Sequence, residues 1–451
     1  MDLRIDAIPA LIRKIALPAS AGMLFSVLMN IVDTAYAGML SATALAALSL
    51  AGPVFFLVLT VGIGTGQATN ALVGNALGAD QPERARHLAL QSIAFATIIS
   101  IIAALLVLAM LTPLLELMGG EDPYLQPARQ YITVVLSGAA LFSLSFSING
   151  ILNTRGDTKT YRNAQFAAVL ANIALDPLFM FTFGLGVTGV AVATVLIQLG
   201  VVVYLFSVVL KLDFMRAPAL QEFVPNIKAF TELAKQSIPT SLSMLLVAVG
   251  SVIIVAYVSR YGESAMAAYG VALRIEQLIL LPVIGINIAA LSLTGVNYGA
   301  NQLQRVRTVF STGVTYAVGL MVIGAFPLVM FGEQLMRLFT DEQAVVDIGV
   351  NYLKIEALIL PAYAVTFLCS AMLQGLKRPQ YTLYCNVFRQ IIAQLLLFHL
   401  VVEVLELGIS SVWYSVLAIN WVMAGVIWWF YNKRINSIEN DITLQPEQQP
   451  V

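Results

Sequence analysis

Twelve apolar segments, each long enough to cross a lipid bilayer, dominate the sequence. A helix needs about 20 apolar residues to span a hydrocarbon core of about 30 Å. The chain is 59% hydrophobic and only 11% charged, whereas a soluble domain has about 25% charged residues. We therefore expect an all-α polytopic membrane protein with most of its surface in lipid. The predicted spans are 9–38, 45–75, 87–115, 127–152, 161–183, 187–211, 228–259, 264–296, 306–332, 345–374, 380–402 and 408–432.

Lysine and arginine predict the orientation of these spans. They gather in the loops on one side, as at Arg84 and Arg86 and at Lys377 and Arg378, and short loops rich in these residues face the cytoplasm. Both termini and the connection after the sixth span are expected on that side, because the number of spans is even. The polar tail 435–451 is predicted to be cytoplasmic and disordered.

The chain repeats itself after a shift of 221 residues. Pro18 then falls on Pro239, and "GNALGADQPERAR" (74–86) falls on "GVNYGANQLQRVR" (295–307) without a gap. Between residues 15 and 86, 22 of 72 positions are identical. Each half has six spans, so the halves share one orientation and are parallel repeats.

Parallel repeats predict two six-helix lobes related by a pseudo-two-fold axis along the membrane normal, which is a transporter architecture. Such transporters place a cavity between the lobes and open it alternately to the two sides. We expect an N-terminal lobe at 1–211, a cytoplasmic connection at 212–227, a C-terminal lobe at 228–434 and a cytoplasmic tail at 435–451.

The repeat also serves as an internal control for function. Two copies of one fold need similar packing residues, so a residue that is polar in one copy and apolar in the other is a candidate for function. Asp33 corresponds to Ile254. Asn172 and Asp176 correspond to apolar residues as well, Ala393 and Leu397.

These candidates lie at one depth in the predicted lobe. Asn172 and Asp176 are four residues apart and share a helix face. Asp33, Asp176 and Thr194 each lie roughly eight residues, or about 12 Å, below the outer ends of their helices. We predict that Asp33, Asn172, Asp176 and Thr194 form one site. Candidates for a surrounding network are Asn30, Tyr36 and Tyr131.

Two carboxylates at this depth favour cation binding. A charged, unpaired carboxylate near the bilayer centre costs about 3 kcal/mol or more, and no lysine or arginine lies at this depth in the N-terminal half. Two neighbouring carboxyl groups couple their titrations, so the pair can bind and release a proton. With the Asn172 and Thr194 oxygens the same set can instead hold Na⁺. A purely structural role, in hydrogen bonds between helices, is the alternative.

The C-terminal half holds secondary candidates. Arg274 and Glu276 lie in the eighth span and Glu356 in the tenth, where Arg274 or Arg389 can neutralise an acid. Pro18 is a candidate hinge of the first span, although its copy Pro239 belongs to the half that lacks the first-span acid. The glycines of "VGIGTGQ" (61–67) lie inside a span and predict close helix packing, not a nucleotide-binding loop.

The sequence resembles the multidrug and toxic compound extrusion (MATE) family from about Ile8 to Arg434. The resemblance rests on the two parallel halves, on the repeated "GNALGADQPERAR" segment, and on the residues that match the family's N-lobe set. It is most similar to the DinF-like branch, because the seventh span, "IPTSLSMLLVAVGSVIIVAYV", lacks the acid found there in the NorM-like and eukaryotic branches. The matching residues are Pro18, Asp33, Asn172, Asp176 and Thr194.

This resemblance implies an antiporter, not an enzyme, in the inner membrane of a prokaryote. It would export amphipathic, often cationic organic compounds by alternating access, and a proton is the expected coupling ion. A Na⁺-coupled antiporter is one alternative, and a flippase for lipid-linked oligosaccharides, with its anionic cargo, is another. No cofactor beyond H⁺ or Na⁺ is expected. The expected partners are small organic substrates and the lipid bilayer, and the protein is expected to be a monomer. No nucleic acid is expected as a partner, since the net charge is -1.

Overall fold

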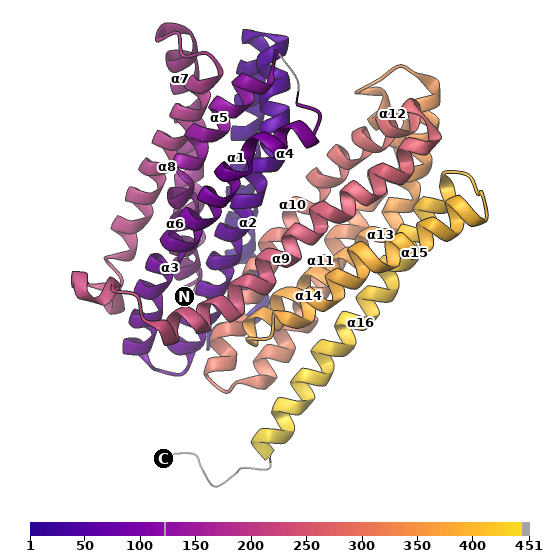
Figure 1. The fold of residues 1–451 in the computed structure, drawn as a ribbon. Helices are drawn as coiled ribbons and strands as arrows, with labels where there is room; N and C mark the ends of the chain where they lie inside the picture. The colour runs from indigo at the N-terminus through magenta and orange to yellow at the C-terminus, as the bar shows by residue number, and fades with distance from the viewer. Residues whose placement is uncertain (121–122, 444–451) are drawn as a thin grey trace. The chain divides into compact units, whose positions relative to one another are not determined.

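A computed structural model of the protein describes residues 1–120 and 123–443. These residues form α-helices joined by short turns and by 3-10 and π-helical segments, and no strand occurs among them. Figure 1 labels the α-helices in chain order. Their bounds are α1 Ile8–Leu40, α2 Ala42–Gly78, α3 Pro82–Ala109, α4 Leu111–Leu117, α5 Leu125–Ser137, α6 Ala139–Asn153, α7 Lys159–Pro177, α8 Val187–Val209, α9 Ile227–Val258, α10 Glu263–Gly299, α11 Leu303–Met330, α12 Gly332–Arg337, α13 Gln343–Gly375, α14 Gln380–Val387, α15 Ala393–Phe398 and α16 Ser410–Thr443.

The structure confirms the predicted spans, with one difference in shape. Within the described residues, 11 helices are long and apolar enough to cross a membrane, and the number is 12 if the pair α5–α6, bent by 47°, is counted as one span. The bend lies at Gly138, where a Cβ atom would meet Cγ2 of Val195 at 2.8 Å. The equivalent residue in the other half is Ile359, inside the continuous helix α13. The fourth span is therefore bent only in the N-terminal half.

The backbone repeats as the sequence does. Adding 221 to the bounds of α2 and α3 gives the bounds of α10 and α11. The left-handed φ of 54° at Asp80 recurs as 57° at Asn301, and the 72° of Gly156 recurs as 58° at Lys377. Where the two halves share a backbone, the positions at which their side chains differ are informative about function.

The chain divides into two compact units. Met1–Ile5 and Leu17–Ser241 form the first unit, and Asp6–Ala16 with the chain from Leu242 onwards forms the second. Within the first unit α7 packs against α8, and α2 packs against α6. The lobe boundaries at 1–211 and 228–434, which come from the count of membrane spans, stay a prediction.

Close packing explains the glycines of residues 61–67. A Cβ at Gly66 would lie 2.6 Å from the backbone oxygen of Phe146 on α6. A Cβ at Gly150, also on α6, would meet the backbone oxygen of Gly66. The prediction that these glycines allow close helix packing is confirmed, because each faces backbone atoms that cannot move aside.

The connection 212–227 is anchored to the start of α3. Arg86 donates to the Glu222 carboxylate from Nε at 2.6 Å and from Nη2 at 2.7 Å, and its Nη1 donates to the Arg216 carbonyl at 2.8 Å. Gln91 donates to the carbonyls of Glu222 and Val224 at 2.9 and 2.8 Å. The hydrogen bonds from Arg86 lower the pKa of Glu222 to about 2. The connection is thus a structured part of the first unit.

We expect Arg86→Gln to raise the rate of tryptic cleavage at Arg216 severalfold, because local opening exposes the backbone to protease. Glu222→Gln should have the same effect. The lowered pKa of Glu222 means that its stabilising contribution is present above the ordinary carboxyl pKa and is lost only as the pH falls toward 2. In the wild type, the protection of the connection against cleavage at Arg216 should therefore not vary between pH 5 and pH 8. The control is Asp213→Asn, which removes only the exposed ion pair with Arg216.

The prediction that the tail is disordered is wrong for residues 435–443, which are helical. Helix α16 continues to Thr443, and Ile435 and Ile438, three residues apart, are buried on one side of this extension. Arg307 holds this extension by donating to Asn436 at 3.0 Å and to Glu439. The sequence prediction gave weight to the polar composition of the segment and overlooked this short amphipathic pattern. Residues 444–451 of the predicted tail lie outside the described residues.

Candidate ion-coupling site

Helices α1 and α7 run parallel and are joined by polar contacts along their length. Gln165 of α7 donates to Ser26 of α1 at 2.5 Å. Two helical turns further on, Asn172 donates to Asp33 at 2.8 Å. Both contacts join residues 139 positions apart, so the two helices keep one register. Their shared polar face brings the predicted site residues together.

The amide of Asn172 links the two predicted carboxylates. Its Nδ2 donates to Oδ1 of Asp33 at 2.8 Å and to Oδ1 of Asp176 at 3.0 Å. Asn172 and Asp176 are fully buried, and Asp33 is 5% exposed. The sequence prediction that these three side chains form one cluster is consistent with this geometry. Two acids that share one donor are close enough for their titrations to be coupled.

Further polar groups lie at the edges of this pair. Thr194 of α8 is buried, and its hydroxyl has no hydrogen-bond partner among the described residues. The same is true of Oδ1 of Asn172. Tyr131 of α5 is buried and interacts electrostatically with Asp33 and Asp176. The carboxylate, amide and hydroxyl oxygens are hard donors, which suit Na⁺ as well as a proton.

The remaining N-terminal candidates are more peripheral. Tyr36 donates from its hydroxyl to the carbonyl of Ile173 at 3.1 Å and so ties α1 to α7. Asn30 is exposed and donates to the Ser26 carbonyl of its own helix at 3.0 Å, outside the acid cluster. Pro18 lies inside the continuous helix α1, close to the point where the two compact units divide.

Of the C-terminal candidates, Glu276 and Glu356 lie near each other, and Arg274 lies apart from them. Glu276 is 8% exposed and accepts a hydrogen bond from Tyr352 at 3.1 Å. Glu356 is fully buried and interacts electrostatically with Glu276. Arg274 lies on the exposed face of α10 and does not line the cavity beside Glu276. Its predicted role of neutralising a buried acid therefore has no support.

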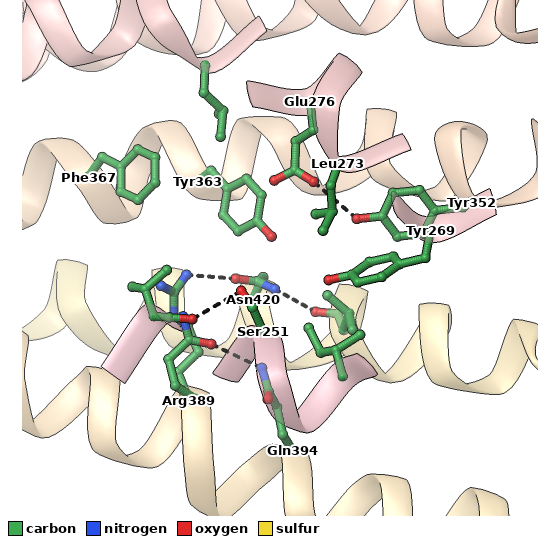
Figure 2. A pocket seen from close by; sticks show the side chains of 15 residues that line it. Ser251, Tyr269, Leu273, Glu276, Tyr352, Tyr363, Phe367, Arg389, Gln394 and Asn420 are labelled. Carbon is green, nitrogen blue, oxygen red and sulfur yellow. Dashed lines mark hydrogen bonds between the residues drawn. The ribbon is translucent and has the colours of Figure 1, made fainter. Parts of the chain in front are cut away.

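Glu276 faces a cavity within the second unit, which Figure 2 shows from close by. Sequence reasoning missed several of its polar lining residues, among them Tyr363 and Asn420. The repeat could have found these two, because they correspond to Phe142 and Leu199.

The family is decided by a match that covers both halves of the chain. The model of the MatE family matches residues 18–178 and 239–398, the same two segments that the repeat relates. The chain belongs to the MatE family. Members of this family are transporters and not enzymes, which confirms the prediction of a multi-pass membrane transporter.

Relatives in the MatE family match over most of their length. The chain is 26% identical over 418 residues to NorM of Thermotoga maritima, a probable multidrug resistance protein, covering 90% of this chain and 88% of that one. It is 25% identical over 394 residues to the FAD transporter of Shewanella oneidensis, covering 85% of each. A solved transporter of the MOP superfamily from Pyrococcus furiosus superposes with a TM-score of 0.90 at 26% identity, covering 97% and 98%.

Proposed function

We propose that this MatE protein is a proton-coupled antiporter that exports amphipathic, often cationic organic compounds by alternating access. The observation that carries the proposal is the buried pair Asp33 and Asp176 on a single Asn172 amide. Two carboxyl groups in membrane spans, with no buried lysine or arginine among the described residues of the same unit, favour occupation by a cation. Exchange of that cation against the substrate would couple transport to an ion gradient.

Several observations support the finer assignments. The acid pair lies in the N-terminal half, and the membrane-spanning stretch of α9 has no acid, which supports the DinF-like branch. A proton needs only the carboxyl pair, whereas Na⁺ needs a fuller shell of oxygens. Asn172 and Thr194 offer two further oxygens, so Na⁺ is the alternative ion at the same residues. We propose that the protein is a monomer in the cytoplasmic membrane. The distribution of lysine and arginine supports an orientation with both termini inside.

The decisive experiment is transport into everted membrane vesicles. Uptake of a fluorescent organic cation is followed after imposing an acidic interior in Na⁺-free buffer, and vesicles that lack the protein serve as the control. We expect the pH gradient alone to drive uptake. The same vesicles are then tested with a Na⁺ gradient and no pH gradient, which should drive little uptake.

Each other outcome contradicts a defined part of the proposal. Uptake driven only by a Na⁺ gradient would show that the coupling ion is Na⁺ and not H⁺, and the antiporter assignment would be unchanged. No uptake with either gradient, at confirmed expression, would contradict export of organic cations. That result would favour the alternative function, transport of an anionic cargo such as a lipid-linked oligosaccharide.

A further inference from the structure

The cavity in the second unit contains an unusual combination of charges for a membrane protein. It has a volume of about 130 Å³. Glu276 and Arg389 lie on opposite sides of it, with the ring of Tyr363 between them (Figure 2). Arg389 is 5% exposed, and Glu276 is 8% exposed. Two buried opposite charges on separate walls, and not in contact, point to a ligand that carries both signs.

The guanidinium of Arg389 is held in place but not neutralised. Its Nη1 donates to the Asn420 side chain at 2.9 Å, and its carbon lies 5.9 Å from the centre of the Tyr363 ring. Nε has no hydrogen-bond partner among the described residues, and no carboxylate there forms an ion pair with Arg389. A buried charge without a counterion is costly. A planar guanidinium with free donors is suited to a carboxylate.

The repeat shows that the fold does not require these charges. Glu276 corresponds to Phe55 and Tyr363 to Phe142. In the first unit Phe55 and Phe142 form an aromatic contact, with ring centroids 4.9 Å apart. Arg389 corresponds to Ala168. An apolar contact in one copy is thus replaced by ionisable groups in the other.

The backbone also departs from the repeat at Arg389. This residue lies in a π-helical segment, Phe388–Ile392, whereas the corresponding residues 167–171 are part of the regular helix α7. The π segment further along, His399–Val404, does have a counterpart in Leu178–Thr182. Short π segments inside α-helices occur often at functional sites. The extra one changes the direction of side chains where the buried cation lies.

We propose that this cavity binds a small aromatic zwitterion, or the zwitterionic head of a larger compound. Arg389 binds its carboxylate, Glu276 binds its ammonium group, and the tyrosine rings contact its aromatic part. Drug-sized sites have volumes of about 300–1,000 Å³, so the cavity of about 130 Å³ fits only a small group. The site is separate from Asp33 and Asp176 and does not depend on the proposed coupling ion.

The test uses two probes that differ by one charge. Binding of 4-(aminomethyl)benzoate and of its methyl ester to the purified full-length protein in detergent is measured by thermal stabilisation, without any gradient. The ester keeps the ring and the ammonium group but lacks the carboxylate. We expect the zwitterion to bind at least about tenfold more tightly than the ester, because a charged pair to arginine is lost. Equal stabilisation by both, or by neither, would overturn the proposal.

Variants locate the binding. Arg389→Gln should lower the affinity for the zwitterion to that for the ester, and Glu276→Gln should weaken the binding of both probes. Arg274→Gln removes an exposed arginine from the same unit and should bind both probes as wild type does. An unchanged preference for the zwitterion in Arg389→Gln would place the ligand elsewhere. If that variant does not fold, the comparison of the two probes on the wild type decides by itself.

Discussion

Asp33→Asn is expected to reduce the rate of ion-driven export at least about tenfold, which corresponds to an increase of about 1.4 kcal/mol or more in the activation free energy of transport. Asparagine keeps an oxygen that can accept the 2.8 Å hydrogen bond from Asn172, so the helix contact survives. It cannot bind and release a proton, so the N-terminal site loses half of its acid pair. Asp176→Asn should act in the same way. Initial uptake rates in everted vesicles, at matched amounts of protein, measure the effect.

The control separates coupling from folding. Asp213→Asn changes an exposed acid in the connection and should transport as wild type does. Asp33→Ile copies the residue at position 254 of the other half and should fold but not transport. Wild-type rates in Asp33→Asn and Asp176→Asn would make both acids structural and would contradict the proposed site.

Gly150→Val is expected to destabilise the first unit by more than about 3 kcal/mol, because large side chains forced into packed regions cost about 1–3 kcal/mol even where neighbours can adjust. Here the added atoms meet the backbone oxygen of Gly66 and, at 3.1 Å, Cβ of Thr69. A backbone carbonyl in a helix cannot adjust without separating α2 from α6. The variant should yield little monodisperse protein after extraction, measured by size-exclusion chromatography of a fluorescent fusion.

Gly52→Val is the matched control for this effect. Gly52 lies on α2, as Gly66 does, but nothing lies within 4 Å of a Cβ built there. It should give a wild-type elution profile. Equal yields from Gly150→Val and the wild type would show that α2 and α6 can separate without loss of folding.

The membrane spans and the candidate acids were predictable from the sequence because each depends on a local pattern. Span length follows from runs of apolar residues, and lipid requires that their backbones form helices. The repeat supplied the comparison that singled out Asp33 and Asp176 against Ile254 and Leu397. The two halves of one chain could be compared with each other, so these acids were distinguishable without a second sequence.

Other features depend on atoms that are distant in the sequence. At Gly138, where the fourth span bends, Val195 leaves no room for a side chain. The amide shared by two acids depends on the register between α1 and α7. The exposure of Arg274 and the burial of Arg389 could not be distinguished by counting residues, because both are arginines in apolar spans.

The sequence by itself thus determined an all-α membrane transporter with two repeated halves and an acid pair in the first, because hydrophobicity and internal repetition act along the chain. Only the tertiary structure decided which polar groups touch, that residues 435–443 extend a helix, and that Glu276 and Arg389 face one cavity. Those features arise where helices from separate parts of the chain pack side by side, and packing is set by the shapes of all neighbours together.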